Sequence, residues 1–330
     1  MRRLYVKELS KPVKISVLEV LLKRLVDHHP KQSEIERDLT LLVAGYKGEK
    51  AVSYYLNFLP KKDYYIFHSL RLPNNGHYFQ MDYLLLTTRF ALILECKNFF
   101  GTLFFDQSFH QLIRTVNDKE EGFHDPLSQV KWHQHQLQNL FHTWRCPLPI
   151  EYFVVIGNPS TIVKTNPQNR HALTKVVHGH RLLNNIQEIE RKFQKEVYDV
   201  KKIRKLSKLL VKQHTPETFD PIQKYGLTYE DILTGVKCPE CGQVGMIYNH
   251  GSWKCQQCQI KKKDAHAESL KDYALLISPT ITNQEFRRFF HVTCPDVANY
   301  LLKKLQLSHS GGTKNRVYYL NEGEFWKNQN

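Results

Sequence analysis

Apolar residues recur every three or four positions in the first part of the chain, which predicts helices. This spacing begins at about residue 14, is interrupted at Pro30, and resumes from about residue 33 to residue 59. The second stretch contains Gly45 and Gly48, which each cost a helix about 1 kcal/mol relative to Ala and allow another backbone to approach closely. The apolar positions are Ile15, Leu18, Leu21, Leu22 and Leu25, then Leu41, Leu42, Val52, Tyr55, Leu56 and Leu59.

Short apolar runs separated by turn residues replace this pattern after residue 63, and they predict strands. The predicted strands cover residues 64–72, 79–86, 90–97 and 101–105. A helix over residues 126–143 and a buried strand over residues 150–156 follow. Strands bracketed by helices in this order predict an α/β sandwich, with a central mixed sheet flanked by helices.

The second half of the chain is more polar. Residues 185–214 predict a basic helical stretch, because nine Lys or Arg and two acidic residues lie between Arg191 and Lys212. Pro216 and Pro221 then indicate a linker. Cysteine pairs occupy residues 236–262, and a last small unit covers residues 280–320.

Charge narrows the class of partner. The 330 residues carry a formal net charge of +15, and 41% of them are hydrophobic, so a packed core with a basic surface is expected. Such a surface favours polyanions, nucleic acid first and an anionic membrane second. The sequence shows neither a continuous apolar run of membrane-spanning length nor a secretory signal, so we expect a cytoplasmic protein with no membrane span.

The segment from Gln80 to Lys97 reads as two strands joined by a tight turn. A turn centred on Thr88 and Arg89 places Asp82 opposite Glu95, with Cβ atoms roughly 4.5–5.5 Å apart. Because side chains alternate along a strand, Lys97 shares a face with Glu95. The alternative reading of these charges is a surface ion pair, although both strands are otherwise strongly apolar.

Two carboxylates this close repel each other unless a cation lies between them. Mg²⁺ prefers one or two carboxylates together with water and phosphate oxygens, so Asp82 and Glu95 are the expected ligands of Mg²⁺ or Mn²⁺. Lys97 could orient or deprotonate a water, or neutralise charge on a phosphate under attack.

These residues resemble the core of the PD-(D/E)xK nucleases, and more narrowly the NERD domain, a nuclease-related domain. The resemblance runs from Gly45 to about Gly157, and Met81 stands where the nuclease motif has its proline. The matching elements are Gly48-Glu49, Gln80-x-Asp82, Glu95-Cys96-Lys97-Asn98, Gly101, and Asp125-Pro126-Leu127-x-Gln129-x-x-x-His133. The resemblance implies a central sheet flanked by helices and metal-dependent cleavage of phosphodiester bonds.

The resemblance also adds residues to the expected catalytic set. Glu49 could bind the metal or orient a water. Alternatively, it is an ordinary solvated residue on the surface of a helix. Gln129 and His133 are four apart on one helical face and could touch a phosphate or the leaving strand, unless they belong to an ordinary polar face. His68 and His77 are weaker candidates for site neighbours. The expected catalytic residues are Glu49, Asp82, Glu95, Lys97 and Gln129.

The cysteine pairs Cys238-x-x-Cys241 and Cys255-x-x-Cys258 are separated by thirteen residues. Each pair aims two thiolates at one ion, and Gly242 permits the positive φ that the first turn requires. The spacing resembles a zinc ribbon, so these four cysteines are the expected ligands of a structural Zn²⁺. Nearby aromatic and basic residues suit contact with nucleic acid, although a ribbon that only joins neighbouring parts is an equal alternative. They are Trp253, Lys254, Lys261, Lys262 and Lys263.

The last unit predicts a capped helix from Thr282 to Phe290, a second helix from Pro295 to Leu305 and a strand at residues 317–320. Two helices followed by a basic hairpin resemble a winged helix-turn-helix, and a small helical cap is the alternative. The expected nucleic-acid contacts are Lys303, Lys304, Lys314 and Arg316.

The sequence therefore predicts a modular protein. Its function is expected to be a metal-dependent nuclease that hydrolyses phosphodiester bonds, DNA being favoured by the winged-helix resemblance alone. The alternative is a nucleic-acid-binding protein that keeps the nuclease fold without catalysis, and a membrane-surface protein held by the basic helix is a weaker third reading. The expected segments are 1–40 (helical), 41–160 (NERD), 161–235 (basic extension and linker), 236–264 (zinc ribbon) and 270–330 (winged-helix-like).

Overall fold

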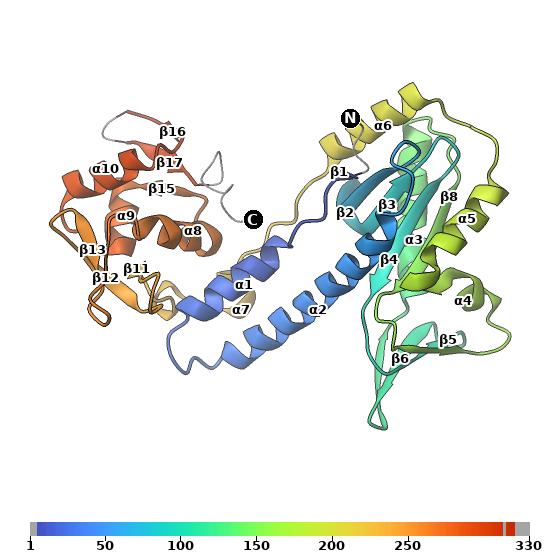
Figure 1. Cartoon of the computed structure of the whole chain (residues 1–330), viewed down its shortest axis with the longest axis horizontal. Helices are drawn as coiled ribbons and strands as arrows, with labels where there is room; N and C mark the ends of the chain where they lie inside the picture. The colour runs from blue at the N-terminus through green and yellow to red at the C-terminus, as the bar shows by residue number, and fades with distance from the viewer. Residues whose placement is uncertain (1–4, 313–314, 321–330) are drawn as a thin grey trace. The chain divides into compact units, whose positions relative to one another are not determined.

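The computed structural model describes residues 5–312 and 315–320, and it is a mixed α/β structure (Figure 1). The chain forms two compact units. Unit 1 comprises residues 1–11 and 41–218, and unit 2 comprises residues 12–40 and 219–330. This division into two units does not test the bounds of the five segments expected from the sequence, and those bounds stay a prediction.

The central sheet of unit 1 has six strands in the order β1-β2-β3-β4-β8-β10. β2, β3 and β4 are antiparallel neighbours, whereas β1 runs parallel to β2, and β8 runs parallel to both β4 and β10. The strands are β1 (Tyr5–Lys7), β2 (Tyr65–Asn74), β3 (His77–Leu86), β4 (Ala91–Lys97), β8 (Ile150–Ile156) and β10 (Val176–His178). Strands β2, β3, β4 and β8 match the sequence prediction to within about two residues.

Helices cover both faces of this sheet (Figure 1). The apolar residues of α3 and α6 share one core with one face, while those of α2 and α5 share a second core with the other. These helices are α2 (Gln32–Leu56), α3 (Pro126–Thr143), α5 (Leu182–Lys192) and α6 (Val200–Gln213), and the short α4 (Arg170–Lys175) and the 3₁₀ turn η1 (Gly179–Arg181) complete the unit. The predicted basic helical stretch over residues 185–214 is helical over most of its length, but it consists of two helices, because the chain leaves α5 at Phe193 and α6 begins after the Asp199 cap.

A second sheet in unit 1, in the order β7-β6-β5-β9, was only partly expected. Its strands are β5 (Thr102–Asp106), β6 (Gln111–Val116), β7 (Lys119–His124) and β9 (Ile162–Thr165). β5 was predicted from the sequence, whereas the β6–β7 hairpin was not. The missed signal was Asn117-Asp118, whose φ angles of 49° and 59° fit the tight hairpin turn that joins β6 to β7.

Unit 2 holds the cysteine pairs and the C-terminal elements. Four short strands form the sheet β11-β12-β13-β14, and three form the sheet β15-β17-β16. The strands are β11 (Val236–Lys237), β12 (Val244–Asn249), β13 (Ser252–Lys254), β14 (Lys261–Lys262), β15 (Thr280–Thr282), β16 (His309–Ser310) and β17 (Val317–Tyr319). The helices are α1 (Val13–Arg24), α7 (Pro221–Tyr225), α8 (His266–Leu276), α9 (Asn283–Phe290) and α10 (Pro295–Lys304), with the 3₁₀ turn η2 at Tyr229–Asp231.

One hydrophobic core joins the cysteine hairpin to the C-terminal helices of unit 2. Trp253 is buried in this core, where its indole N–H donates to Nδ1 of His266 at 3.1 Å. The prediction that Trp253 contacts nucleic acid is therefore wrong.

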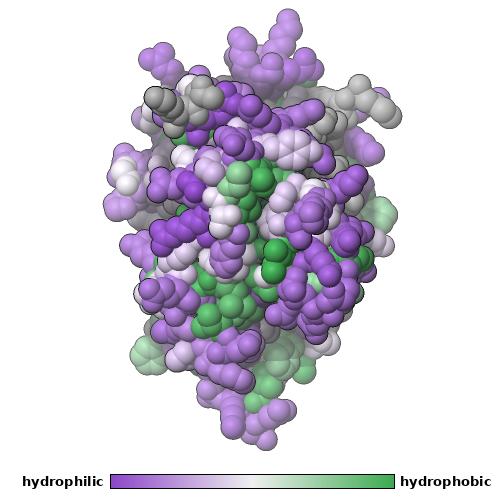
Figure 2. All heavy atoms as spheres, turned by 90° about the vertical axis from the view of Figure 1, so that its left-hand side faces the viewer, coloured by the Kyte–Doolittle hydropathy of each residue, from purple (hydrophilic) through white to green (hydrophobic). Residues whose placement is uncertain are grey.

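Figure 2 shows hydrophilic side chains over most of the face it presents, interrupted by small hydrophobic patches. Within the described residues, no helix combines the length and apolarity that a membrane crossing requires.

A buried arginine ties α1 to the rest of unit 2. The side chain of Arg24 is fully buried, and its Nε donates to Asp272 at 2.7 Å. Its Nη1 donates to the backbone oxygens of Leu233 and Gly235, and its guanidinium lies 5.3 Å from the ring centroid of Phe289. Removing this cation leaves a carboxylate and two carbonyls without their donor.

We therefore expect Arg24→Ala to destabilise unit 2 by about 3–5 kcal/mol, the usual result of breaking one side of a buried ion pair. Hydrogen exchange of peptides from α8 and α9 measures this loss. Arg37→Ala is the matched control, since Arg37 is 72% exposed and 4.0 Å from Asp38, and it should change stability by less than about 0.5 kcal/mol. Equal protection in both variants would contradict the role of Arg24.

Candidate nuclease site and metal centre

The β3–β4 register is the one predicted from the sequence. Tyr83 pairs with Leu94 and Leu86 pairs with Ala91, and Asp82 and Glu95 are the next residues of the two strands beyond the last pair. The Asp82 carboxylate accepts a hydrogen bond of 2.7 Å from the backbone N–H of Cys96. The Asp82 and Glu95 carboxylates therefore lie near each other just beyond the β3–β4 ladder, where the charge of Glu95 acts on Asp82.

Burial, followed by the charges of Glu95 and Glu49, raises the pKa of Asp82 well above its ordinary value. The charges of Glu95 and Glu49 thus both act on Asp82. Their oxygens do not all converge on one point, however. Among the described residues, the only three or more Cys, His, Asp or Glu side chains whose ligand atoms lie within 4.8 Å of one another are the four cysteines.

Lys97 lies beside Glu95, as the alternation of side chains predicted. Its Nζ donates to Oε1 of Glu95 at 2.8 Å and to Oε1 of Gln129 on α3 at 3.0 Å. Burial by itself would lower the pKa of Lys97, but the Glu95 carboxylate outweighs it and the pKa is raised. The side chain therefore stays an ammonium ion at neutral pH, and since it is 22% exposed, the site opens to solvent there.

The surroundings of the second carboxylate oxygen of Glu95 indicate whether a cation could bind there. Glu95 is 3% exposed, and its Oε2 is buried without a hydrogen-bond partner among the described residues. Nδ1 of His133 on α3 lies 3.7 Å away, and burial lowers the pKa of His133, so this ring is neutral at neutral pH. A buried, unpaired carboxylate oxygen beside a second carboxylate fits the ligand set of a hard divalent cation.

α2 brings Glu49 to the same end of the sheet. A Cβ on Gly48 would lie 2.5 Å from Cβ of Asn98, and one on Gly157 would lie 3.1 Å from Cα of Gly48. The absence of side chains at these two glycines is what lets α2 approach the ends of β4 and β8 so closely. The prediction of close approach is confirmed for Gly48, whereas a Cβ on Gly45 would meet nothing within 4 Å.

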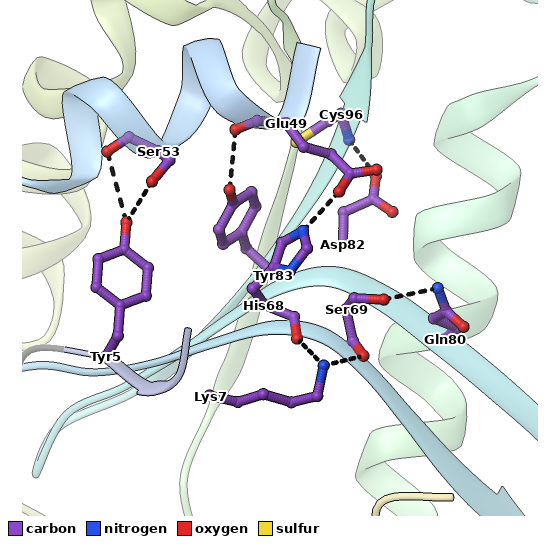
Figure 3. Close-up of polar contacts among 10 residues, drawn as sticks. All are labelled: Tyr5, Lys7, Glu49, Ser53, His68, Ser69, Gln80, Asp82, Tyr83 and Cys96. Atoms are coloured by element: carbon purple, nitrogen blue, oxygen red, sulfur yellow. Dashed lines mark hydrogen bonds and ion pairs between the residues drawn. The ribbon is translucent and has the colours of Figure 1, made fainter. Parts of the chain in front are cut away.

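His68 on β2 holds the side chain of Glu49. Its Nε2 lies 2.5 Å from Oε2 of Glu49, and the hydroxyl of Tyr83 donates to the Glu49 backbone oxygen at 2.9 Å (Figure 3). His68 itself is buried. Of the two histidines named from the sequence, the structure brings His68 to the site, whereas His77 is exposed at the β2–β3 turn.

A backbone irregularity sets the direction of the Asp82 side chain. Phe67 and Leu70 on β2 both point into one core although they are three residues apart, and so do Leu84 and Met81 on β3. Strict alternation would put each pair on opposite faces, so both strands change face between these residues. Ser69, which the register places opposite Asp82, has a φ of 49°.

Lys7 on β1 supports this irregularity. Its Nζ donates to the backbone oxygens of His68 at 2.7 Å and Ser69 at 3.0 Å, and the Ser69 hydroxyl accepts from Nε2 of Gln80 at 3.0 Å (Figure 3). Sequence reasoning missed both Lys7 and Ser69. Neither residue lies in a recognisable motif, and only the pairing of β1 with β2 brings Lys7 to the site.

The four cysteines of unit 2 form the second candidate centre. Sγ of Cys238 lies 3.6 Å from that of Cys258, and Sγ of Cys241 lies 3.6 Å from that of Cys255. A tetrahedron with metal–sulfur bonds of about 2.3 Å has edges of about 3.8 Å, so a metal ion such as zinc fits among these thiols. Gly242 has a φ of 77°, the positive value expected after the first pair.

The expected nucleic-acid contacts are only partly visible. Lys303 and Lys304 are exposed in the last turn of α10. Arg316 is half-buried just before β17, and its Nε is buried without a hydrogen-bond partner in the described structure. Lys314 lies outside the described residues.

Comparison with known proteins gives one match, and it lies within unit 1. Residues 44–157 match the family described as NERD: Nuclease-related domain. Neither the curated proteins nor the solved structures yielded a match. The matched range contains Glu49, Asp82, Glu95, Lys97 and Gln129, and the chain therefore carries a nuclease-related domain of the NERD family at residues 44–157.

Proposed function

We propose that unit 1 is a divalent-metal-dependent nuclease that hydrolyses phosphodiester bonds, with DNA as the favoured substrate. The observation that carries the proposal is the buried, unpaired Oε2 of Glu95 beside Asp82 and the Lys97 ammonium group. The central sheet is flanked by helices, and Asp82, Glu95 and Lys97 lie on its inner strands β3 and β4. This arrangement supports a PD-(D/E)xK-like sandwich. The family match supports a nuclease-like or nucleic-acid-related role.

Asp82 and Glu95 would hold Mg²⁺ or Mn²⁺, which when bound supplies a reactive water and draws charge from a phosphoryl oxygen. The backbone N–H of Cys96 fixes one oxygen of Asp82 and leaves the other for a ligand. Gln129 and Glu95 hold the Lys97 ammonium at the open side of the site. There it would neutralise charge that develops on the phosphate, and because its pKa is raised, this role suits it better than that of a base.

Glu49 would orient a water, and His68 would keep its carboxylate in place. In unit 2, we propose that the cysteines bind a structural zinc as a zinc ribbon. The order α8, β15, α9, α10, β16, β17 supports a winged-helix-like unit. Lys303, Lys304, Lys314 and Arg316 remain its proposed nucleic-acid contacts.

The first test is cleavage of labelled single- and double-stranded DNA, with matched RNA, in Mg²⁺ or Mn²⁺. We expect Glu95→Gln and Lys97→Met each to slow cleavage by at least about 10²-fold, because each removes charge that acts on the transition state. Lys119→Met, which changes an exposed lysine of β7, is the control. Cleavage that survives both site changes would refute the proposal, and binding without cleavage under any divalent ion would favour the non-catalytic alternative.

A second test addresses the residues that hold the site. His68→Asn should weaken Mn²⁺ binding and cleavage by about 10–100-fold, as loss of a group behind a ligand usually does. Ser69→Gly should retain both, since glycine accepts a positive φ, whereas Ser69→Val should lose both because a β-branched residue is strained there. Isothermal titration with Mn²⁺ measures the first effect, with His77→Asn as the exposed control. Unchanged Mn²⁺ affinity in both His68→Asn and Ser69→Val would exclude a positioning role.

A third test concerns the cysteines. The purified protein should contain one zinc per chain by elemental analysis, and Cys255→Ser should lose it because three thiolates and a hydroxyl bind zinc more weakly. The hydrogen-exchange protection of α8 and α9 should fall as well, since these helices share a core with the cysteine hairpin. Cys294→Ser, which changes an exposed cysteine outside the group, should retain zinc. Full zinc content in Cys255→Ser would show that the ligand set is wrong.

A further inference from the structure

α6 is a strongly two-sided helix whose apolar side is already used. Ile203, Leu206 and Leu210 are buried in the core that also contains Tyr65 and Phe67 of the central sheet. The helix lies beside β1 and β2 (Figure 1). This apolar face is therefore not available for insertion into a membrane.

The opposite side of α6 is a basic stripe. Lys201, Lys205, Lys208 and Lys212 follow one another at intervals of four, three and four residues, which places them along one line of the helix, and Arg204 lies next to that line. All of these side chains are exposed. Among the described residues, none of the five takes part in an ion pair, whereas the neighbouring Lys202 lies 3.8 Å from Asp199.

Such a stripe costs stability. Like charges three or four residues apart on a helix repel each other and destabilise it. Acidic side chains at these positions would have relieved the repulsion, yet Asp199 is the N-cap and faces the first turn. A row of unpaired cations on a helix that is otherwise held by its core matches the surface of a polyanion.

The stripe runs toward the nuclease site. At the start of α6, the backbone N–H groups of Val197 and Tyr198 donate to the oxygen of Thr88 in the β3–β4 turn, which lies at the far end of the sheet. At its end, the Thr215 N–H donates to the oxygen of Arg71, two residues beyond Ser69. α6 also packs on the same face of the sheet as α3, the helix that contributes Gln129 and His133 to the site.

We propose that this α6 stripe, defined as Lys201, Arg204, Lys205, Lys208 and Lys212, binds the phosphate backbone of the nucleic acid on which the nuclease site acts. The inference rests on the proposed function for the identity of the ligand. A helix of fourteen residues is about 21 Å long, the length of about six base-pair steps of B-DNA at 3.4 Å each, so several phosphates can lie along it. Contacts of this kind position the strand without reading its sequence.

The test is binding of a labelled 30-nucleotide DNA, single- or double-stranded, without added Mg²⁺ or Mn²⁺ at several salt concentrations. The quadruple variant Lys201→Gln, Lys205→Gln, Lys208→Gln and Lys212→Gln should bind at least tenfold more weakly at 100 mM KCl. Its slope of log K against log[salt] should be smaller by about three, because each lost phosphate contact removes about 0.7–0.9. Its thermal midpoint should not fall, since repulsion along the helix is relieved, and this separates lost contacts from misfolding.

The matched control has the same net charge: Lys61→Gln, Lys119→Gln, Lys164→Gln and Lys195→Gln change exposed lysines of unit 1 outside α6. It should bind like the wild type. Equal weakening in both variants, or wild-type affinity in the α6 variant, would overturn the proposal. So would a loss seen only on vesicles that contain phosphatidylserine, because that would identify a membrane as the partner.

Binding measured without added Mg²⁺ or Mn²⁺ keeps the two proposals separate. If the wild type never cleaves in Mg²⁺ or Mn²⁺ but the α6 variant still loses affinity, the nuclease proposal fails and the α6 proposal stands. If the wild type cleaves and the α6 variant binds and cleaves equally well, only the α6 proposal fails.

Discussion

The candidate site depends on an electrostatic conflict that the β3–β4 hairpin imposes. The register of this hairpin brings Asp82 and Glu95 together at the end of a ladder whose other members are apolar. Close carboxylates in a dry environment are costly unless protons, an ammonium group or a metal ion neutralise them. Lys97 relieves the conflict at one oxygen of Glu95, and the other oxygen remains unpaired. Nearby buried carboxylates lower the stability of the fold, whereas they favour the binding of a cation.

Residues distant in sequence from the β3–β4 hairpin position the side chains around Asp82 and Glu95. Gly48 lets α2 approach closely enough to bring Glu49 to the site, and His68 fixes its carboxylate. The left-handed Ser69 lies where both β2 and β3 change face, and Lys7 binds the two carbonyls at that point. Strained backbone of this kind persists only where the surroundings over-determine it, and it is often found at functional sites.

Unit 2 has a small core, and two polar groups support it: the four thiols and the Arg24–Asp272 ion pair. Four thiols gather where a metal ion can bind, and a buried arginine joins α1 to α8. Trp253 fills the space between the cysteine hairpin and the C-terminal helices. A residue type that often stacks on bases is here part of the core, so the cysteine hairpin packs against its neighbours and also carries four thiols that could hold a metal ion.

The sequence by itself determined the local features. Hydrophobic periodicity located α2, β2, β3, β4, α3 and β8, the position of the hairpin turn predicted the β3–β4 register, and the cysteine spacing located the thiol group. These predictions succeeded because each depends on residues close together along the chain or on a fixed geometric period. The burial of Trp253 and the positions of Lys7 and Ser69 at the site were decided only by the tertiary structure, because they depend on which distant surfaces pack together.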